Sequence, residues 1–404
     1  MKILHTSDWH LGQYFMMKTR EAEHFAFLNW LVDIIKKEKI DALIIAGDIF
    51  DSSAPPSYAR KLYSDFIVKL QASACQQLII VSGNHDSVAV LNENKSLLTA
   101  LNVSVLAGLS DDLSEHLITL KNSRQQETAI VCALPFLRAG DVMSSELGLS
   151  AEKKQLNLQQ GIDNTYQAIY QLAKEKCADK KLPIIATGHL TTVGCSVSES
   201  ERDIYIGTLG AFPSSLFPDF DYIALGHLHR AQKVQKSEHI RYSGSPIALS
   251  FEETKHDKQV MIVEFTEKNA IKVTPSIVPS FQQLQVISGD LESVCRQLSD
   301  LKEANKQKSI WVEIKLQQAF YVSDIQAQLN SSLEDSQIEI LKISTPQLNE
   351  NSQWQETDAT TLDALTPIEL FQHRLQCEEN LSEQQQSDLC RLFAQVCAEL
   401  EDKA

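Results

Sequence analysis

Residues 42–48 read Ala42-Leu43-Ile44-Ile45-Ala46-Gly47-Asp48, a short aliphatic run followed by a glycine and an acid. A run this short and this apolar predicts a buried strand rather than a helix. The glycine allows the backbone to turn sharply as it leaves the sheet. We therefore expect Asp48 at the carboxyl end of a strand, where α/β sheets bind their substrates.

The same pattern recurs along the first two thirds of the chain. Apolar runs lead to Asp8 and His10, to Asn84 and His85, to His189, and to His227 and His229. Apolar residues at helical spacing predict helices between the early runs, with Phe25, Leu28, Leu31, Val32 and Ile35 in residues 21–38 and Tyr58, Leu62, Phe66 and Leu70 in residues 57–72. Alternating strands and helices predict an α/β fold.

The composition is that of an ordinary globular protein, with 43% hydrophobic and 22% charged residues. No stretch approaches the ~20 apolar residues that span a bilayer, so we expect a cytoplasmic protein. Eight cysteines without a Cys-x-x-Cys pair indicate reduced thiols. The net charge of −16 disfavours direct binding of DNA, unless bound cations or a partner supply positive charge.

The candidate site residues are carboxylates, imidazoles and one amide. Each short motif is common by itself, but their order after predicted strands is specific. Two cations ~3.5–4 Å apart can neutralise a phosphodiester and activate water, with one carboxylate bridging them. Mixed nitrogen and oxygen ligands suit Mn, Fe, Co or Zn. The motifs, in order, are Asp8-x-His10, Gly47-Asp48-x-x-Asp51, Gly83-Asn84-His85-Asp86, Gly188-His189 and Gly226-His227-x-His229.

In this order the motifs resemble the calcineurin-like metallophosphoesterase superfamily. Flanking segments, including 6–12, 55–60, 186–194 and 203–207, resemble its SbcD family of bacterial Mre-type nucleases. The resemblance implies a β-sandwich flanked by helices and two Mn²⁺ ions. One ion would be held by Asp8, His10, Asp48 and His229, and the other by Asp48, Asn84, His189 and His227. His85 would contact the scissile phosphate, oriented by Asp51 or Asp86.

The same resemblance implies a DNA exo- and endonuclease that acts on duplex ends and hairpins in repair, recombination and replication. It would be a homodimer, associated with the nucleoid, and would bind an SbcC-like ATPase of the SMC/Rad type. The sequence has no Gly-x-x-x-x-Gly-Lys-Ser/Thr loop, so any ATP dependence is expected from that partner. The alternatives are a stand-alone phosphatase or small-nucleotide phosphodiesterase, and a non-catalytic scaffold that should have lost ligands.

Beyond the catalytic region the pattern changes. We expect a metallophosphoesterase domain over 1–276, a small α+β capping domain over 277–344, a linker over 345–364 and a helical hairpin over 365–404. Because the hairpin has no core of its own, it must dock on a partner or pack back on the body of the chain, and we expect docking on a partner. Arg230 is the strongest of six basic residues that are candidates for DNA contacts, although a solvated surface position is the simpler interpretation of each: Lys18, Arg20, Arg138, Arg202, Arg230 and Arg241.

Overall fold

The computed structural model describes residues 1–143, 150–196, 211–266, 271–305, 309–318 and 336–345, without positions 74, 76, 123 and 179, and in addition residues 325, 329, 333, 371 and 389–393. The chain divides into two compact units. Unit 1 comprises residues 1–286, 305–313 and 337–342, and unit 2 comprises the intervening and remaining residues. None of the helices in these described ranges is long and apolar enough to cross a membrane.

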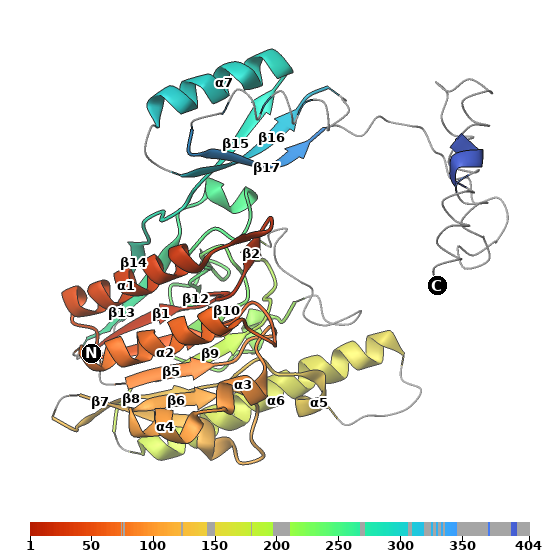
Figure 1. Ribbon diagram of the computed structural model, residues 1–404. Helices are drawn as coiled ribbons and strands as arrows, with labels where there is room; N and C mark the ends of the chain where they lie inside the picture. The colour runs from red at the N-terminus through yellow and green to blue at the C-terminus, as the bar shows by residue number, and fades with distance from the viewer. Residues whose placement is uncertain are drawn as a thin grey trace. The chain divides into compact units, whose positions relative to one another are not determined.

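Two six-stranded sheets form the centre of unit 1 (Figure 1). The first sheet has the order β14 (Ile271–Ile277), β13 (Gln259–Phe265), β1 (Lys2–Thr6), β4 (Ala42–Ala46), β5 (Gln77–Val81) and β6 (Val103–Leu106). The second has the order β11 (Gln232–Lys233), β12 (Ile240–Tyr242), β10 (Tyr222–Gly226), β9 (Ile184–His189), β8 (Glu127–Cys132) and β7 (Leu117–Lys121).

The strands that precede the candidate site residues are parallel within each sheet. In the first sheet β1, β4, β5 and β6 run parallel. In the second, β8, β9, β10 and β12 do the same. The antiparallel strands lie toward the edges: β13 and β14 in the first sheet, β7 and β11 in the second. The carboxyl ends of β1, β4 and β5 therefore lie at one edge of their sheet, as those of β9 and β10 do in theirs.

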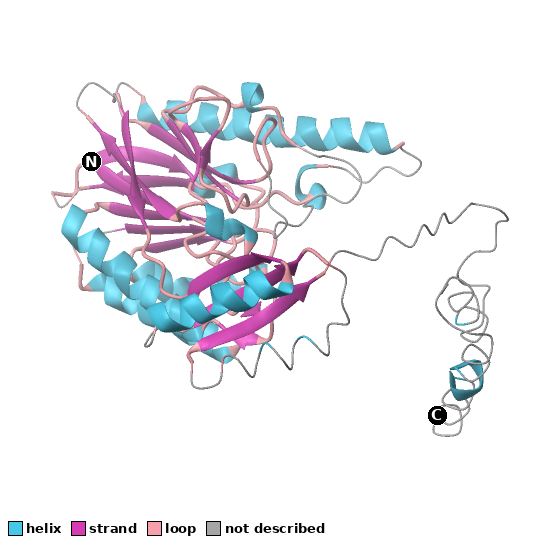
Figure 2. Cartoon of the chain, turned by 90° about the horizontal axis from the view of Figure 1, so that it is seen from above, coloured by secondary structure: helices cyan, strands magenta, loops and turns pink. Residues whose placement is uncertain are grey.

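The core has three layers, and their positions follow from the strand patterns. Ile44, Ile79 and Val131 belong to a cluster that draws residues from both sheets. On the outer faces, α1 (Glu21–Glu38) and α2 (Ser57–Gln71) cover the first sheet and α6 (Ala151–Cys177) covers the second. Figure 2 shows the strands in the middle with helices on either side. The predicted β-sandwich flanked by helices is therefore confirmed.

Both predicted early helices are present, with one error in the predicted apolar face. Phe25 is 49% exposed and lies under the Lys69 ammonium, 4.8 Å from its ring centroid. Phe27 takes the buried position instead. Shorter elements of unit 1 are β2 (Tyr14–Phe15), β3 (Lys18–Thr19), α3 (Val88–Asn92), α4 (Lys95–Ala100), α5 (Ala139–Val142), and 3₁₀ turns at Leu113–His116, Ser214–Leu216 and Glu252–Lys255.

After residue 277 the chain forms β15 (Gln283–Gly289), α7 (Leu291–Ala304), β16 (Ile310–Leu316) and β17 (Ile338–Ser344), with the sheet order β15-β16-β17. The predicted capping domain over 277–344 stays a prediction. The predicted linker at 345–364 and most of the predicted hairpin at 365–404 lie outside the described residues. Within the described part, the rings of Phe371 and Phe393 stack with centroids 4.0 Å apart.

The cysteines in the described ranges are free thiols, and Cys75, Cys132 and Cys177 are buried. Burial raises the pKa of Cys75 to about 12. The three buried thiols are therefore packing groups. Cys377 and Cys397 lie outside the described residues.

Candidate metal centre

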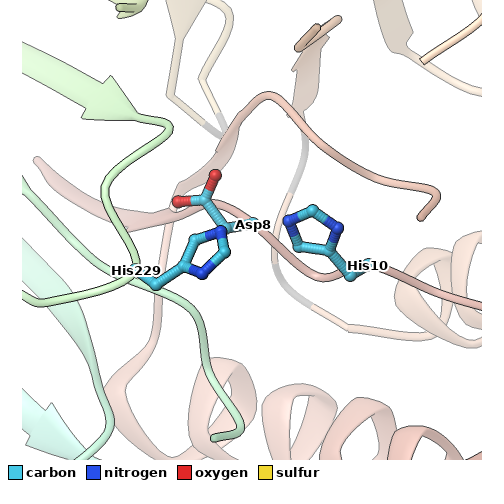
Figure 3. Close-up of side chains that lie close together, drawn as sticks. All are labelled: Asp8, His10 and His229. Atoms are coloured by element: carbon cyan, nitrogen blue, oxygen red, sulfur yellow. The ribbon is translucent and has the colours of Figure 1, made fainter. Parts of the chain in front are cut away.

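The candidate ligands meet where the parallel strands of the two sheets end. Ligand atoms of Asp8, His10 and His229 lie within 4.8 Å of one another, and Figure 3 shows these side chains facing each other. The ligand atoms of Asp48, His189 and His227 form a second group, and they also lie within 4.8 Å of one another. Since β1 and β4 belong to the first sheet and β9 and β10 to the second, the stacking of the sheets creates both groups.

Asp48 contacts both groups. Its Oδ2 atom lies 3.6 Å from Nε2 of His10 and 3.2 Å from Nε2 of His189. Asn84 belongs beside the second group, because its Oδ1 atom lies 3.0 Å from the same Nε2 of His189. All seven predicted ligands are thus gathered in one place, and a single carboxylate oxygen lies between the two halves.

Three of the histidines are held through Nδ1, on the side of the ring away from this centre. Nδ1 of His10 lies 3.1 Å from the Asp51 carboxylate. Nδ1 of His189 lies 2.9 Å from the backbone oxygen of Ala46. Nδ1 of His229 lies 3.2 Å from the Glu253 carboxylate. Each of these oxygens accepts a hydrogen bond, so each Nδ1 carries a proton, and in the neutral ring Nε2 is then unprotonated.

The Nε2 atoms of His10 and His189 are placed to bind a cation. Nε2 of His10 is buried and has no hydrogen-bond partner among the described residues. Nε2 of His189 faces oxygens of Asp48 and Asn84, and lone pairs on all three atoms would repel one another unless a proton or a cation lay between them. The donor set of imidazole, carboxylate and amide suits a first-row divalent metal. The residues present therefore fit the metals that the sequence predicted.

Charges in the centre are strongly coupled. Burial opposes ionisation of Asp48, but the neighbouring charge of His189 holds its pKa well below the usual range. Burial alone would lower the pKa of His189, yet the Asp48 carboxylate raises it to about 9. Burial raises the pKa of Asp8, and burial lowers that of His227. Without a metal, a proton on His189 thus partly neutralises the buried acids.

His85, like Asn84, is half-buried, whereas the other candidate ligands are buried. Its Nδ1 lies 2.7 Å from the backbone oxygen of Asp51, while its backbone nitrogen donates to Oδ1 of Asp48 at 2.9 Å. Asp51 therefore reaches His85 through its main chain and turns its carboxylate to His10. The Asp86 carboxylate accepts hydrogen bonds from the backbone nitrogens of Ile49, Phe50 and Gly83, and so ties the two loops together.

The loops that carry the ligands have unusual backbone geometry. Asp8, His10, Asp48 and His227 all adopt positive φ, at 54°, 46°, 50° and 94°. Such conformations are costly for residues with a Cβ, and they cluster at functional sites. The predicted sharp turn at Gly47 is present, with φ 93°.

At two other positions a glycine is required because neighbouring atoms leave no room for a Cβ. A Cβ on Gly83 would lie 2.1 Å from Oδ1 of Asp48, and one on Gly226 would lie 1.9 Å from the backbone oxygen of Ala46.

The structure adds one functional candidate that sequence reasoning missed and corrects two others. Glu253, the partner of His229, is buried in the 3₁₀ turn at Glu252–Lys255. Two adjacent acids begin this turn, and the local sequence gives no sign of which one is buried. Arg20 and Arg241 are buried and paired with Glu23 and Glu238, so the predicted surface position is wrong for both.

Among the other basic candidates, Arg230 is exposed directly after His229. Lys18 pairs with Glu339, and the Arg138 guanidinium lies over the ring of Phe136, 5.7 Å from its centroid. Arg202 lies outside the described residues. Of the five basic candidates within the described residues, Arg230 is the exposed one that directly follows a candidate metal ligand.

Comparison with known proteins agrees with this geometry. Residues 1–231 match the family model of the calcineurin-like phosphoesterases, and residues 280–379 match the model described as the type 5 capsule protein repressor C-terminal domain.

Three similar proteins are named as the SbcD component of the nuclease SbcCD. The one from Escherichia coli strain K12 is 43% identical over 393 residues, covering 97% of each chain. The one from Rhodobacter capsulatus is 38% identical over 65% of this chain and 66% of its own. The one from Staphylococcus saprophyticus is 31% identical over 80% of each chain. The chain therefore belongs to the calcineurin-like phosphoesterases, a superfamily of metal-dependent phosphodiesterases, and within it to the SbcD family of nuclease components.

Proposed function

We propose that this chain is the nuclease component of an SbcC–SbcD-like complex and hydrolyses phosphodiester bonds at duplex DNA ends and hairpins, in DNA repair, recombination and replication. It would work in the cytoplasm, on the nucleoid, as a homodimer. The reaction would use two divalent cations, with Mn²⁺ as the physiological metal. The relatives that are named as parts of the SbcCD nuclease support the nuclease activity and the complex.

The observation that carries the two-metal proposal is the position of Asp48. Its Oδ2 lies between the Asp8, His10 and His229 group and the His189 and His227 group. A carboxylate in that position can bind both ions. Asp8, His10, Asp48 and His229 would hold one ion, and Asp48, Asn84, His189 and His227 the other. Two such ions supply positive charge to the phosphate and lower the pKa of a water molecule.

The chain's own residues would do the rest. The Nδ1–H of His85 donates to the backbone oxygen of Asp51, which can only accept. This bond stabilises the protonated ring and leaves Nε2 to donate a proton to the leaving oxygen. Because His85 is half-buried while the predicted metal ligands other than Asn84 are buried, it is within reach of a bulky substrate. Arg230 would contact a phosphate beside the scissile one.

The partner would compensate for the charge of the chain. A chain with a net charge of −16 repels DNA at a distance, and its metal ions act only at the site. An SbcC-like ATPase that grips the duplex would bring the DNA to this edge of the sheets. The helical hairpin at 365–404 would bind that ATPase through apolar residues such as Leu392, which is 61% exposed.

One experiment separates this proposal from a stand-alone phosphodiesterase. The purified chain, together with an SbcC-like ATPase and ATP, is incubated with Mn²⁺ and either a labelled linear duplex, a DNA hairpin or bis(p-nitrophenyl) phosphate, and Asp48→Asn serves as the inactive control. We expect both DNA substrates to be cut, with loss of cutting in EDTA and in the variant. Hydrolysis of the aryl diester without cleavage of either DNA would assign the chain to small phosphodiesters and overturn the DNA proposal.

A further inference from the structure

Behind the metal ligand His229 lies a buried network of charges. Oε1 of Glu253 contacts Nδ1 of His229 at 3.2 Å. Its other oxygen, Oε2, accepts hydrogen bonds from the Lys258 ammonium, from Oγ of Ser245 at 3.2 Å and from the backbone nitrogen of Leu249 at 3.1 Å. Glu253 is 5% exposed. The carboxylate is therefore fixed by three donors before it meets the histidine.

Lys258 completes the network and locks it to the same loop. Its Nζ donates to the backbone oxygen of His229 at 3.1 Å and to Oγ of Ser245 at 2.7 Å. The side chain is only 12% exposed. A buried acid without a cation would be costly. The lysine thus neutralises Glu253 and attaches it to the backbone of the residue whose ring it holds.

We propose that Glu253 is a positioning residue for His229, and that it sets the metal affinity of the Asp8, His10 and His229 half of the centre. The carboxylate accepts a hydrogen bond from Nδ1–H of His229. The ring is therefore fixed in one tautomer, with Nε2 directed at the metal. A carboxylate behind a histidine ligand also makes the imidazole a stronger donor. This inference rests on the proposed two-metal site.

The other half of the centre is built differently. His189 is held by the neutral backbone oxygen of Ala46, which no side-chain substitution removes. Loss of the charge on Glu253 should therefore lower the affinity of the chain for one ion and leave its affinity for the other unchanged. A general destabilisation of the fold would weaken both.

The test is a titration of the full-length, metal-free chain with Mn²⁺, in which the free ion is followed by electron paramagnetic resonance. Three variants are compared: Glu253→Gln, the double variant Glu253→Gln/Lys258→Met, and Glu252→Gln. Glu252 is the exposed neighbour, so its substitution changes the same charge without touching His229. The double variant removes both buried charges, which protects against misfolding of Glu253→Gln through an unpaired lysine.

We expect Glu253→Gln and the double variant to lose about 10- to 100-fold in the affinity of one ion while the second ion binds as in the wild type. Glu252→Gln should bind both ions close to wild type. Wild-type affinity in the double variant would overturn the inference, since only charge balance would then matter. A wild-type chain that binds a single ion would overturn the two-metal proposal instead, and the affinity of that ion in Glu253→Gln would still decide the role of Glu253.

Discussion

His85 is tied to Asp48 through its backbone: the amide nitrogen of His85 donates a hydrogen bond to Oδ1 of Asp48 at 2.9 Å. The residue that would protonate the leaving oxygen and the carboxylate that would bridge the metals therefore share one loop contact. The side chain of His85 takes no part in that contact. We therefore expect this hydrogen bond to remain when the side chain is removed.

His85→Ala is expected to keep both metal ions and to lose cleavage by about 10²–10⁴-fold, the usual contribution of a general acid. Calorimetric titration with Mn²⁺ measures the first property, and cleavage of a labelled duplex the second. Asp48→Asn is the matched comparison, because it should lose both. Cleavage by His85→Ala within about tenfold of the wild type would mean that another group supplies the proton.

Gly83→Ala should damage the metal centre although it adds only one methyl group. That Cβ would lie 2.1 Å from Oδ1 and 2.4 Å from the backbone nitrogen of Asp48. We expect a loss of Mn²⁺ binding and of about 1–3 kcal/mol of stability, typical of overpacking. Gly140→Ala is the control, since nothing lies within 4 Å of its Cβ. Equal metal affinity and melting temperature in the two variants would contradict the close packing at Gly83.

Stability of the metal-free protein should depend on pH through His189. Burial alone would lower the pKa of His189, but the Asp48 carboxylate raises it to about 9, above its ordinary value of 6.5. Its contribution to stability is therefore complete below pH 6.5 and is lost as the pH rises through 9. The urea midpoint of the metal-free chain should fall over this range, and His189→Gln should lack that part of the fall. Identical pH profiles for the wild type and His189→Gln would show that His189 does not cause the loss of stability.

Metal binding should displace the same proton. At about pH 7.5 we expect Mn²⁺ binding to release on the order of one proton per chain, because the cation takes the Nε2 position that the proton holds. Calorimetry in buffers of different ionisation enthalpy measures this number directly. Binding enthalpies that do not vary with the buffer would show that His189 is already neutral.

Removal of residues 365–404 should spare cleavage of simple substrates and release the ATPase partner. The candidate metal-binding groups and His85 all lie before residue 260, and the deleted part is expected to be a partner-binding hairpin. Co-purification of the truncated chain with an SbcC-like ATPase tests the assignment. A complex that survives the deletion would place the partner surface elsewhere on the chain.

The local sequence was enough for the strands, the early helices and the ligand types. An aliphatic run, a glycine and a polar residue form a pattern within a few residues, and the helix predicted at 21–38 is α1 with those bounds. Such patterns are local, so they can be recognised without the fold. The error at Phe25 has the opposite cause, since Phe25 and Phe27 lie on different faces of the helix and only the packing of α1 shows that Phe27 is the buried one.

The sequence by itself thus determined the chemistry of this protein: which residues end the strands, and that they are of the types that bind metals. Only the tertiary structure decided what stands behind each ligand, with Asp51 turned to His10, Ala46 holding His189 and Glu253 holding His229. These partners are 41, 143 and 24 residues apart in the chain. No periodicity links these positions, because Asp51 and His10 follow neighbouring strands of one sheet, whereas His189 and Ala46 belong to strands of different sheets. Their pairing therefore depends on the tertiary structure.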